Sequence, residues 1–495
     1  MKEKIYLKNG INIAILISII TLFYKLIDFA KITKYFPLDQ INDMSSYMAQ
    51  LFFLKSCGFH NICNYWYNGF ISFSFSPPGW YFFSYPFYLI TGDVKLALFI
   101  SQIISYTLAF LIIFFLFGKN LNLSYKKRII YFLFTFANAI VIGSFIRLGR
   151  VHELLTWVLF LFLLFLFLYY KENKLNINFF IVPLIFSLIL ITYPSTAVLA
   201  SLLFLGLFLI KPWKERIYII IAYLISLIIA SFWLIPFILN ISKSSIPHLK
   251  QATWVFQISG GNLYTFIASL IIPLLVLITF YFYYLGIKNK KEIIFFSPIL
   301  VLSILFLLKL TAFLPIINTI FPDPLMIFMI FFIGLFLLKT KTNKKVINLL
   351  ISLFIIAFLI TSSAFSLFYT KGFINPNNEL NRDILKSINQ VETSFVILGN
   401  IPKTSYEKAI YSYAAIYKNK STPEGWYPQL AERHYVEEIR EYMDTKNLNC
   451  NDHKNFFKKF NVTDIIYIKG IKNELEECNL KIKHETDTVY LFNAA

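Results

Sequence analysis

Eleven apolar runs of about the length that crosses a lipid bilayer constrain the fold of this chain more than any other feature. A bilayer-spanning helix needs about 20 mostly apolar residues, within a range of about 17–25. With 57% hydrophobic and only 15% charged residues, the chain lacks the polar surface that a soluble protein of 495 residues needs. The pattern predicts a polytopic all-α membrane domain of about eleven transmembrane helices. The runs are 11–30, 94–118, 128–146, 154–170, 177–193, 195–210, 217–240, 263–285, 293–309, 324–338 and 346–369.

The lysines and arginines between these runs predict the orientation of the chain. With the N-terminus in the cytosol, the inner loops carry about 19 Lys and Arg, whereas the short outer loops carry about 4. Basic residues collect on the cytosolic side of membrane proteins, so this asymmetry favours a cytosolic N-terminus. An odd number of spans then places the tail after Tyr369 outside the cell. The first run is too long for a cleaved signal peptide, and no small-residue cleavage site follows it.

The formal net charge of +19 comes from the membrane part of the chain. From Thr370 to the end, about 17 basic residues balance about 17 acidic ones. The excess therefore lies among the apolar runs, where basic residues meet anionic lipid headgroups. No basic patch with interleaved aromatic residues remains, which excludes nucleic acid as a partner. The acids Glu172 and Glu292 are expected to pair with lysines at the cytosolic surface.

Two segments outside the apolar runs are too long to be simple connectors. The first outer loop, 31–93, holds an amphipathic stretch at 43–54 and an aromatic one at 78–90, as interfacial segments do. The tail has normal polarity and predicts a small α/β domain. We therefore divide the chain into a multi-pass membrane domain at 1–369, with a second outer loop at 146–153, and an extracytoplasmic domain at 370–495. The tail's expected strands are 394–398, 464–468 and 488–492, and its expected helices are 431–443 and 453–460.

All four cysteines fall in the segments predicted to lie outside the membrane. Cys57 and Cys63 form one local pair, and Cys450 and Cys478 form the other. An oxidising compartment favours two disulfides. Four unpaired thiols are the alternative.

Glu153 is the most informative acid, because it begins a long apolar run. It ends the sequence Arg147-Leu-Gly-Arg150-Val-His152-Glu153, so two arginines, a histidine and a glutamate share one short outer loop. Ionisable groups at the membrane are costly and usually functional. Helix capping combined with headgroup contact is the alternative explanation.

Asp43 is predicted on the same side of the membrane as Glu153. Two carboxylates from separate loops can hold a divalent cation, Mg or Mn, that neutralises a phosphate leaving group. Alternatively, one of them can act as general base on an acceptor hydroxyl. Arg147 and Arg150 suit a lipid phosphate, because the guanidinium fork matches its oxygens; ordinary headgroup contact is the alternative.

Other familiar signatures are absent from the sequence. We find no Walker A loop, dinucleotide fingerprint, HExxH or paired CxxC motif. The middle apolar runs carry no charge beyond their ends, and no internal repeat is apparent. Both absences argue against a pump or a coupled carrier.

Three segments of the first outer loop resemble a group of archaeal and bacterial membrane proteins. The segments are Asp43-Met-Ser-Ser-Tyr47, Asn64-Tyr-Trp-Tyr-Asn-Gly-Phe70 and Phe73-Ser-Phe-Ser-Pro-Pro78. These proteins are historically labelled 6-pyruvoyl-tetrahydropterin synthase-related and are similar to the GT-C glycosyltransferase superfamily. Further matches are Gly149-Arg-Val-His-Glu153, Thr192-Tyr-Pro194 and Asn461-Val-Thr-Asp-Ile-Ile-Tyr467. Tyr47 and Tyr193 replace the usual histidines, which puts any role of those imidazoles in doubt.

The resemblance implies a GT-C-like fold and a glycosyltransferase with a polyprenyl-phosphate-linked sugar donor. It implies Asp43 as the catalytic base or metal ligand, with Asp39 as the alternative acid, and Glu153 as a second ligand or substrate anchor. The residues expected to bind substrate are Arg147, Arg150 and His152, at the donor phosphate, together with Trp66 and Tyr67.

Transfer is expected on the outer face, to a glycan, lipid or protein acceptor that the sequence leaves open. Two other functions stay open as well. One is a transporter or flippase for a lipid-linked glycan, and the other is a non-catalytic membrane scaffold.

Overall fold

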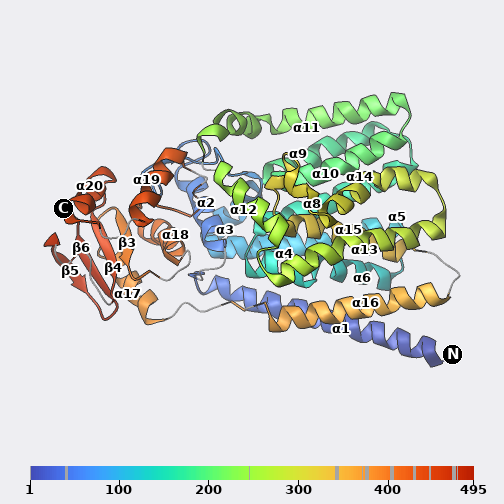
Figure 1. Cartoon of the computed structure of the whole chain (residues 1–495), viewed down its shortest axis with the longest axis horizontal. Coiled ribbons are helices and arrows are strands. Elements are labelled where there is room, and N and C mark those ends of the chain that lie inside the picture. Colours follow the sequence, from blue (N-terminus) through green and yellow to red (C-terminus); the bar gives the residue numbers. More distant parts are fainter. Residues whose placement is uncertain are drawn as a thin grey trace. The chain divides into compact units, whose positions relative to one another are not determined.

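The computed structural model describes residues 2–38, 43–244, 246–340, 345–370, 372–373, 378–401, 406–426, 428, 431–444, 448–470, 475 and 478–494. The chain divides into two compact units (Figure 1). The membrane unit is Met1–Phe29, Ile100–Ile235 and His248–Gly372. The tail unit is Ala30–Phe99, Pro236–Pro247 and Phe373–Ala495, so it joins the first outer loop to the C-terminal tail.

Among the described residues up to 368, the regular elements are helices, apart from two short strands in the first outer loop. Two stretches, η2 and η3, are π-helical turns that continue α4 and α7. In chain order the elements are α1(Lys2–Phe29), η1(Ala30–Thr33), α2(Met44–Ser56), β1(Ile62–Cys63), β2(Phe70–Ile71), α3(Gly79–Thr91), α4(Val94–Leu111), η2(Ile112–Phe117), α5(Gly118–Asn120), α6(Tyr125–Phe136), α7(Ala139–Val141), η3(Ile142–Arg147), α8(Val151–Glu172), η4(Ile177–Phe180), α9(Ile181–Thr192), α10(Pro194–Ile210), α11(Trp213–Asn240), η5(Ile241–Lys243), α12(Ile246–Ser259), α13(Leu263–Ile287), α14(Lys290–Leu307), η6(Leu310–Phe313), η7(Ile317–Thr319), α15(Pro322–Lys339) and α16(Lys345–Phe368).

Seven helices among the described residues are long and apolar enough to span a membrane. They are Leu7–Thr33, Val94–Asn120, Val151–Glu172, Trp213–Lys243, Leu263–Ile287, Pro322–Lys339 and Lys345–Phe368. The pair Tyr125–Phe136 and Ala139–Arg147, bent by 45°, gives an eighth if it counts as one span. The other three predicted runs are helical too, but α9 and α10 are short and α14 begins with three charged residues. The multi-pass prediction is confirmed, and the full count of eleven spans stays a prediction.

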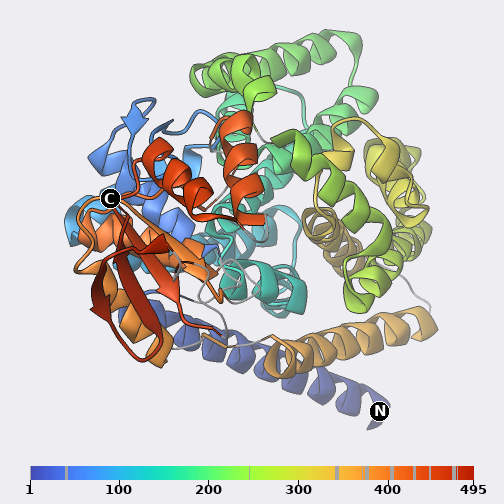
Figure 2. The ribbon, with the colours of Figure 1, turned by 60° about the vertical axis from the view of Figure 1, so that its left-hand side comes forward.

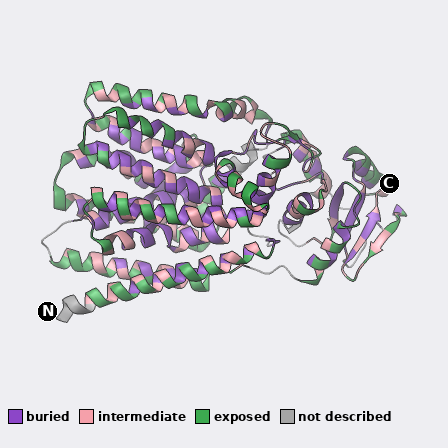
Figure 3. Ribbon diagram, turned by 180° about the vertical axis from the view of Figure 1, so that it is seen from behind, coloured by how far each residue is buried: buried purple, intermediate pink, exposed green. Residues whose placement is uncertain are grey.

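The core of the membrane unit lies around α15 and α8. Every residue of α15 from Leu325 to Leu338 is buried, as expected for a helix that is apolar on all sides. The outer helices α1 and α16 pack against each other and carry much of the exposed surface (Figure 3). On α11, Ile228 is 69% exposed, and a lipid environment explains such an exposed apolar side chain.

One glycine sets a close helix contact in this unit. A Cβ added to Gly206 of α10 would lie 2.2 Å from the carbonyl oxygen of Phe295 of α14. Small residues let membrane helices approach to this extent.

The tail unit holds a four-stranded sheet in the order β3-β4-β6-β5 (Figure 2). Its elements are α17(Glu379–Ile388), β3(Phe395–Gly399), α18(Tyr406–Lys418), α19(Arg433–Asp444), α20(Cys450–Lys459), β4(Asp464–Ile468), β5(Ile482–Glu485) and β6(Val489–Asn493). β3 runs parallel to β4, with Ile397 opposite Ile466, and the other two pairings are antiparallel. All five residues of β4 are buried, because it is an inner strand.

The predicted α/β tail is confirmed in its three strands and two helices. The sequence did not predict the edge strand β5, because its residues are half exposed and carry no apolar alternation. Phe456 and Phe457 of α20 pack with Ile439 of α19 and Val396 of β3 in one core.

The first outer loop is tied to the tail by hydrogen bonds within the tail unit. The Thr422 backbone N–H donates to the Tyr65 carbonyl at 2.9 Å, and the Asn68 side chain donates to the Phe460 carbonyl at 2.7 Å. Trp66 and Thr422 also form a β-bridge. The structure joins the cysteines as the disulfides Cys57–Cys63 and Cys450–Cys478, which staple the loop and the tail separately.

Candidate functional site in the membrane unit

The polar turn before α8 is built by an irregular stretch of backbone. The π-helical segment η3 ends at Arg147, and Gly149 follows with a φ of +69°, a conformation that favours glycine. Inside η3, the Phe145 carbonyl accepts a hydrogen bond from the Gln102 side chain at 3.0 Å. π-helical turns occur frequently at functional sites. This turn brings Arg150 to the N-cap of α8, one turn from Glu153.

Arg150 lies between two carboxylates. Its Nη1 is 3.6 Å from Glu153 Oε1 and 3.6 Å from Asp323 Oδ2. The Glu153 side chain is 2% exposed, whereas those of Arg150 and Asp323 are 19% and 30% exposed. The guanidinium also lies over the ring of Phe321, 5.8 Å from its centroid. Arg150 therefore links the N-terminal end of α8 to that of α15. Its partner on α8, Glu153, is buried, and its partner on α15, Asp323, is partly exposed.

Tyr193 completes this cluster from the turn between α9 and α10. Its ring lies edge-on to the His152 ring, with centroids 4.9 Å apart, and its side chain lies close enough to Glu153 to feel the charge of the carboxylate. The Thr156 hydroxyl donates to the His152 carbonyl at 2.8 Å. The tyrosine that replaces a histidine in the resemblance therefore contacts the sequence's candidate residues directly.

Arg147 adds a second guanidinium to this end of the membrane unit. It lies close enough to Lys25 of α1 for the two charges to interact. The Lys25 ammonium donates to the Thr370 carbonyl at 2.8 Å. Arg147, Arg150, His152 and Glu153 are all placed by the turn that the sequence singled out.

Asp43 belongs to the tail unit, where it is the N-cap of α2 and is half-buried. Its carbonyl accepts the backbone N–H groups of Ser46 and Tyr47 at 3.1 and 3.2 Å. Burial raises the pKa of Tyr81 above its ordinary value, and the negative charge of Asp43 contributes to that rise. Asp39 lies outside the described residues. Because Asp43 and Glu153 belong to different units, their joint action stays a prediction.

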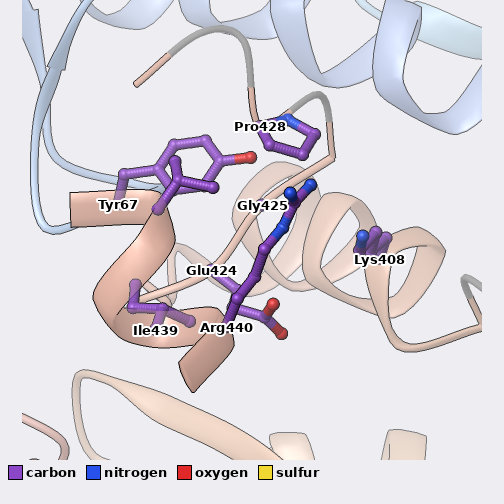
Figure 4. Close-up of a pocket in the computed structure, with 8 residues that line it drawn as sticks. Tyr67, Lys408, Glu424, Gly425, Pro428, Ile439 and Arg440 are labelled. Atoms are coloured by element: carbon purple, nitrogen blue, oxygen red, sulfur yellow. The ribbon is translucent and has the colours of Figure 1, made fainter. Parts of the chain in front are cut away.

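The two aromatic candidates of the first loop differ in their surroundings. Trp66 is wholly buried, and a Cβ on Gly425 would lie 2.8 Å from its indole ring. The Tyr67 side chain is also largely buried, but it lines a pocket of the tail unit (Figure 4). Its hydroxyl donates to the Trp426 carbonyl at 2.7 Å, and burial raises its pKa well above the ordinary value.

The acids of the membrane unit do not by themselves fit a divalent cation. Among the residues that the structure describes, no group of three or more His, Cys, Asp or Glu side chains could hold a metal. Glu153 and Asp323 offer oxygens of the kind that Mg²⁺ and Mn²⁺ prefer, but Arg150 lies 3.6 Å from each. A cation placed there would meet the Arg150 charge, and an anion could approach the guanidinium only by displacing one of the two carboxylates.

Asp323, an acid that the sequence places near the outer face, was not predicted as a site residue. It stands between two prolines in the first turn of α15, where the helix dipole favours an acid. Like Glu153, it stands at the start of a long apolar run. The same criterion could therefore have identified Asp323 as a candidate site residue.

The sequence matches no protein-family model and no curated protein. Its structure is similar to that of the arabinofuranosyltransferase AftD from Mycobacteria, with a TM-score of 0.56 and 11% identity over 94% of this chain. That match covers 35% of AftD, so the chain spans about a third of its length. A structure of the Archaeoglobus fulgidus oligosaccharyltransferase tethered with an acceptor peptide matches at a TM-score of 0.51 and 11% identity, over 94% of this chain and 69% of that one. The A. fulgidus oligosaccharyltransferase AglB, in complex with an inhibitory peptide and a dolichol-phosphate, matches at 0.50 and 11%, over 94% and 70%.

Identities this low show the fold alone. The chain is a multi-pass membrane protein with the fold of GT-C glycosyltransferases, as the resemblance implied. The narrower likeness to the pterin synthase-related proteins stays an expectation.

Proposed function

We propose that this chain is a membrane glycosyltransferase that transfers a sugar from a polyprenyl-phosphate-linked donor to an acceptor on the outer face. The observation that carries the proposal is Arg150, held between Glu153 and Asp323 at the N-terminal ends of α8 and α15. The complex of AglB with a dolichol-phosphate supports a lipid-linked donor for this fold.

In this proposal, Arg150, Arg147 and His152 bind the donor phosphate. A helix N-terminus favours an anion through its free N–H groups and its dipole, and a guanidinium fork matches phosphate oxygens. Glu153 acts mainly by holding Arg150 in place, since its carboxylate is buried and lies 3.6 Å from the guanidinium. Asp323 is the more exposed partner of Arg150, so it is the contact that a phosphate would displace.

Asp43 is proposed as the general base. It would take the proton of the acceptor hydroxyl while that oxygen attacks the anomeric carbon. The bond from this carbon to the donor phosphate oxygen breaks, and its electron pair leaves with the phosphate. The arginines stabilise the negative charge that develops there. Direct displacement of this kind inverts the anomeric configuration.

We also propose that Asp43 and Glu153 together hold the divalent cation expected from the sequence. The displacement reaction itself does not require this cation. Comparing transfer after treatment with EDTA and after adding Mg²⁺ or Mn²⁺ would test it directly.

Sugar transfer in reconstituted vesicles tests the proposed function. The purified protein would receive a panel of polyprenyl-phosphate sugars together with lipid, glycan and peptide acceptors. We expect a labelled sugar to appear on an acceptor, with the released polyprenyl phosphate in equal amount. Movement of the intact lipid-linked sugar between leaflets without any transfer would instead indicate a flippase.

The orientation is tested by protease protection in right-side-out vesicles. With the tail outside, we expect trypsin to remove the region after Tyr369 while the lysine-rich loops stay protected. Cleavage of those loops in sealed vesicles, with the tail intact, would reverse the proposed topology.

A further inference from the structure

One glutamine of α12 holds the loop that leads into α15. This loop, residues 314–321, contains the 3-10 turn η7 and is called the η7 loop below. The Gln257 side-chain amide donates to the Ile317 carbonyl at 2.7 Å and to the Ile320 carbonyl at 2.6 Å. The Gln257 side chain is 1% exposed, and a buried hydrogen bond is stronger than one in water. The amide therefore fixes both ends of η7 to α12.

Two other side chains of α12 also contact the η7 loop. Thr253 stands one helical turn before Gln257, and its hydroxyl donates to the Asn318 carbonyl at 3.0 Å. The Phe256 ring packs against the Phe321 ring, with their centroids 6.0 Å apart. The helix α12 thus holds the η7 loop from its middle to its last residue.

The η7 loop contains a strained turn. Ile316 has a φ of +70° and a ψ of −52°, and the Ile317 backbone N–H donates to the Pro315 carbonyl at 2.8 Å. These features describe a γ-turn of positive φ, which is rare, and a β-branched residue seldom adopts it. The Ile316 side chain is 64% exposed, so its own packing does not enforce the turn. Strain of this kind persists only where the surrounding structure holds it, and the bonds from α12 follow directly after it.

The η7 loop leads into the two groups of α15 that contact Arg150. Phe321 is the N-cap of α15, and its ring centroid lies 5.8 Å from the guanidinium. Asp323 Oδ2 lies 3.6 Å from Arg150 Nη1. Ile320, whose carbonyl accepts from Gln257, directly precedes Phe321. The bonds from α12 therefore fix the backbone immediately before both contacts.

We propose that Gln257 is a positioning residue that sets the affinity of the donor site for phosphate. Gln257 holds the η7 loop, and the loop holds the Asp323 carboxylate on Arg150. A phosphate reaches the guanidinium by displacing Asp323, because the other carboxylate, Glu153, is only 2% exposed. Without the Gln257 bonds, the strained turn relaxes and Asp323 leaves Arg150, so that phosphate binds more tightly. The assignment of this cluster to a donor phosphate rests on the proposed glycosyltransferase function.

Titration of farnesyl phosphate onto the full-length protein in nanodiscs, followed by isothermal titration calorimetry, tests the proposal without any sugar transfer. We expect Asp323→Asn to bind the probe at least about tenfold more tightly than the wild type, because a carboxylate no longer competes for the guanidinium. Arg150→Gln should bind it at least about tenfold more weakly, which assigns the signal to this site.

Gln257→Met keeps the length of the side chain but removes its N–H donors. We expect this variant to bind farnesyl phosphate at least about threefold more tightly than the wild type, as coupling through a shared network allows. If Gln257 acts through Asp323, adding Gln257→Met to Asp323→Asn should bring no further gain. A residue that only stabilises the fold would neither raise the affinity nor lose its effect in the double variant.

Ser259→Ala is the matched control, because the Ser259 hydroxyl donates to the Val255 carbonyl of α12 itself. It should leave the affinity for farnesyl phosphate unchanged. Thermal unfolding shows whether each variant is folded. Thr253→Val removes only one bond to the η7 loop and serves as the milder variant if Gln257→Met does not fold.

Three results would overturn the proposal. The first is equal affinity of the wild type and Asp323→Asn. The second is a lower unfolding temperature of Gln257→Met without tighter binding, and the third is a further gain of affinity in the double variant. Absence of binding by both the wild type and Asp323→Asn would also refute it. The expected affinities without any sugar transfer would support the positioning role and locate the fault in the proposed function.

Discussion

Glu292→Gln is expected to lower the free energy of unfolding of the membrane unit by about 3–5 kcal/mol, because it breaks a buried ion pair. Glu292 Oε1 lies 2.5 Å from Lys171 Nζ, and their side chains are 6% and 2% exposed. The Tyr283 hydroxyl donates to the other carboxylate oxygen at 2.9 Å. These three residues join α8, α13 and α14. Without the carboxylate, the Lys171 charge would stay buried without its main counter-ion.

Glu172→Gln is the matched control for this prediction. Its side chain is 57% exposed, 3.2 Å from Lys171 and 3.7 Å from Lys291, so its loss should cost at most about 1 kcal/mol. Replacing both buried partners, as Lys171→Met with Glu292→Leu, should restore most of the stability, because no uncompensated charge then remains. Thermal unfolding in nanodiscs measures all three variants. Equal losses for Glu292→Gln and Glu172→Gln would show that burial does not determine the effect.

Arg150→Gln is expected to lower kcat/KM for the lipid-linked donor about 100-fold, which corresponds to about 2.7 kcal/mol. The reason is that the variant removes a charge-assisted contact to the donor phosphate in a site of low exposure. The kcat/KM of Arg150→Lys should lie between those of the wild type and Arg150→Gln, since a lysine keeps the positive charge but lacks the forked guanidinium. Initial rates over a range of donor concentrations separate kcat from KM.

Arg150 also neutralises Glu153, so its loss can affect folding as well as transfer. Thermal unfolding of each variant separates the two effects, because a purely structural role would lower the folded fraction and leave kcat/KM per folded molecule unchanged. That outcome would remove Arg150 from the donor site. Arg433→Gln, which breaks an exposed pair in the tail unit, should leave the rate unchanged.

The sequence predicted what depends on local patterns. The eleven apolar runs are all helical, and the strand-like runs 464–468 and 488–492 predicted β4 and β6 to within one residue. The turn from Arg147 to Glu153 was found because ionisable groups are rare near long apolar runs. Each of these features is encoded within about twenty neighbouring residues.

What the sequence did not predict depends on contacts between distant segments. Glu292 was expected to pair at the cytosolic surface, and this was wrong, since α8 and α13 bury it against Lys171 and Tyr283. The pairing of Arg150 with Asp323 joins residues 173 positions apart in the chain, because α15 packs into the core. The hydrogen bond from Thr422 to Tyr65 likewise joins the first loop to the tail, and no local pattern signals it.

The measurement that tests the central claim most directly is sugar transfer by the wild type and by Asp43→Asn combined with Glu153→Gln, in the same vesicles. We predict transfer by the wild type and a loss of at least about 10²-fold in the double variant, as expected when a general base is removed. Unfolding curves and protease protection would confirm that the variant is folded and inserted. Undiminished transfer by a folded double variant would contradict the proposed site.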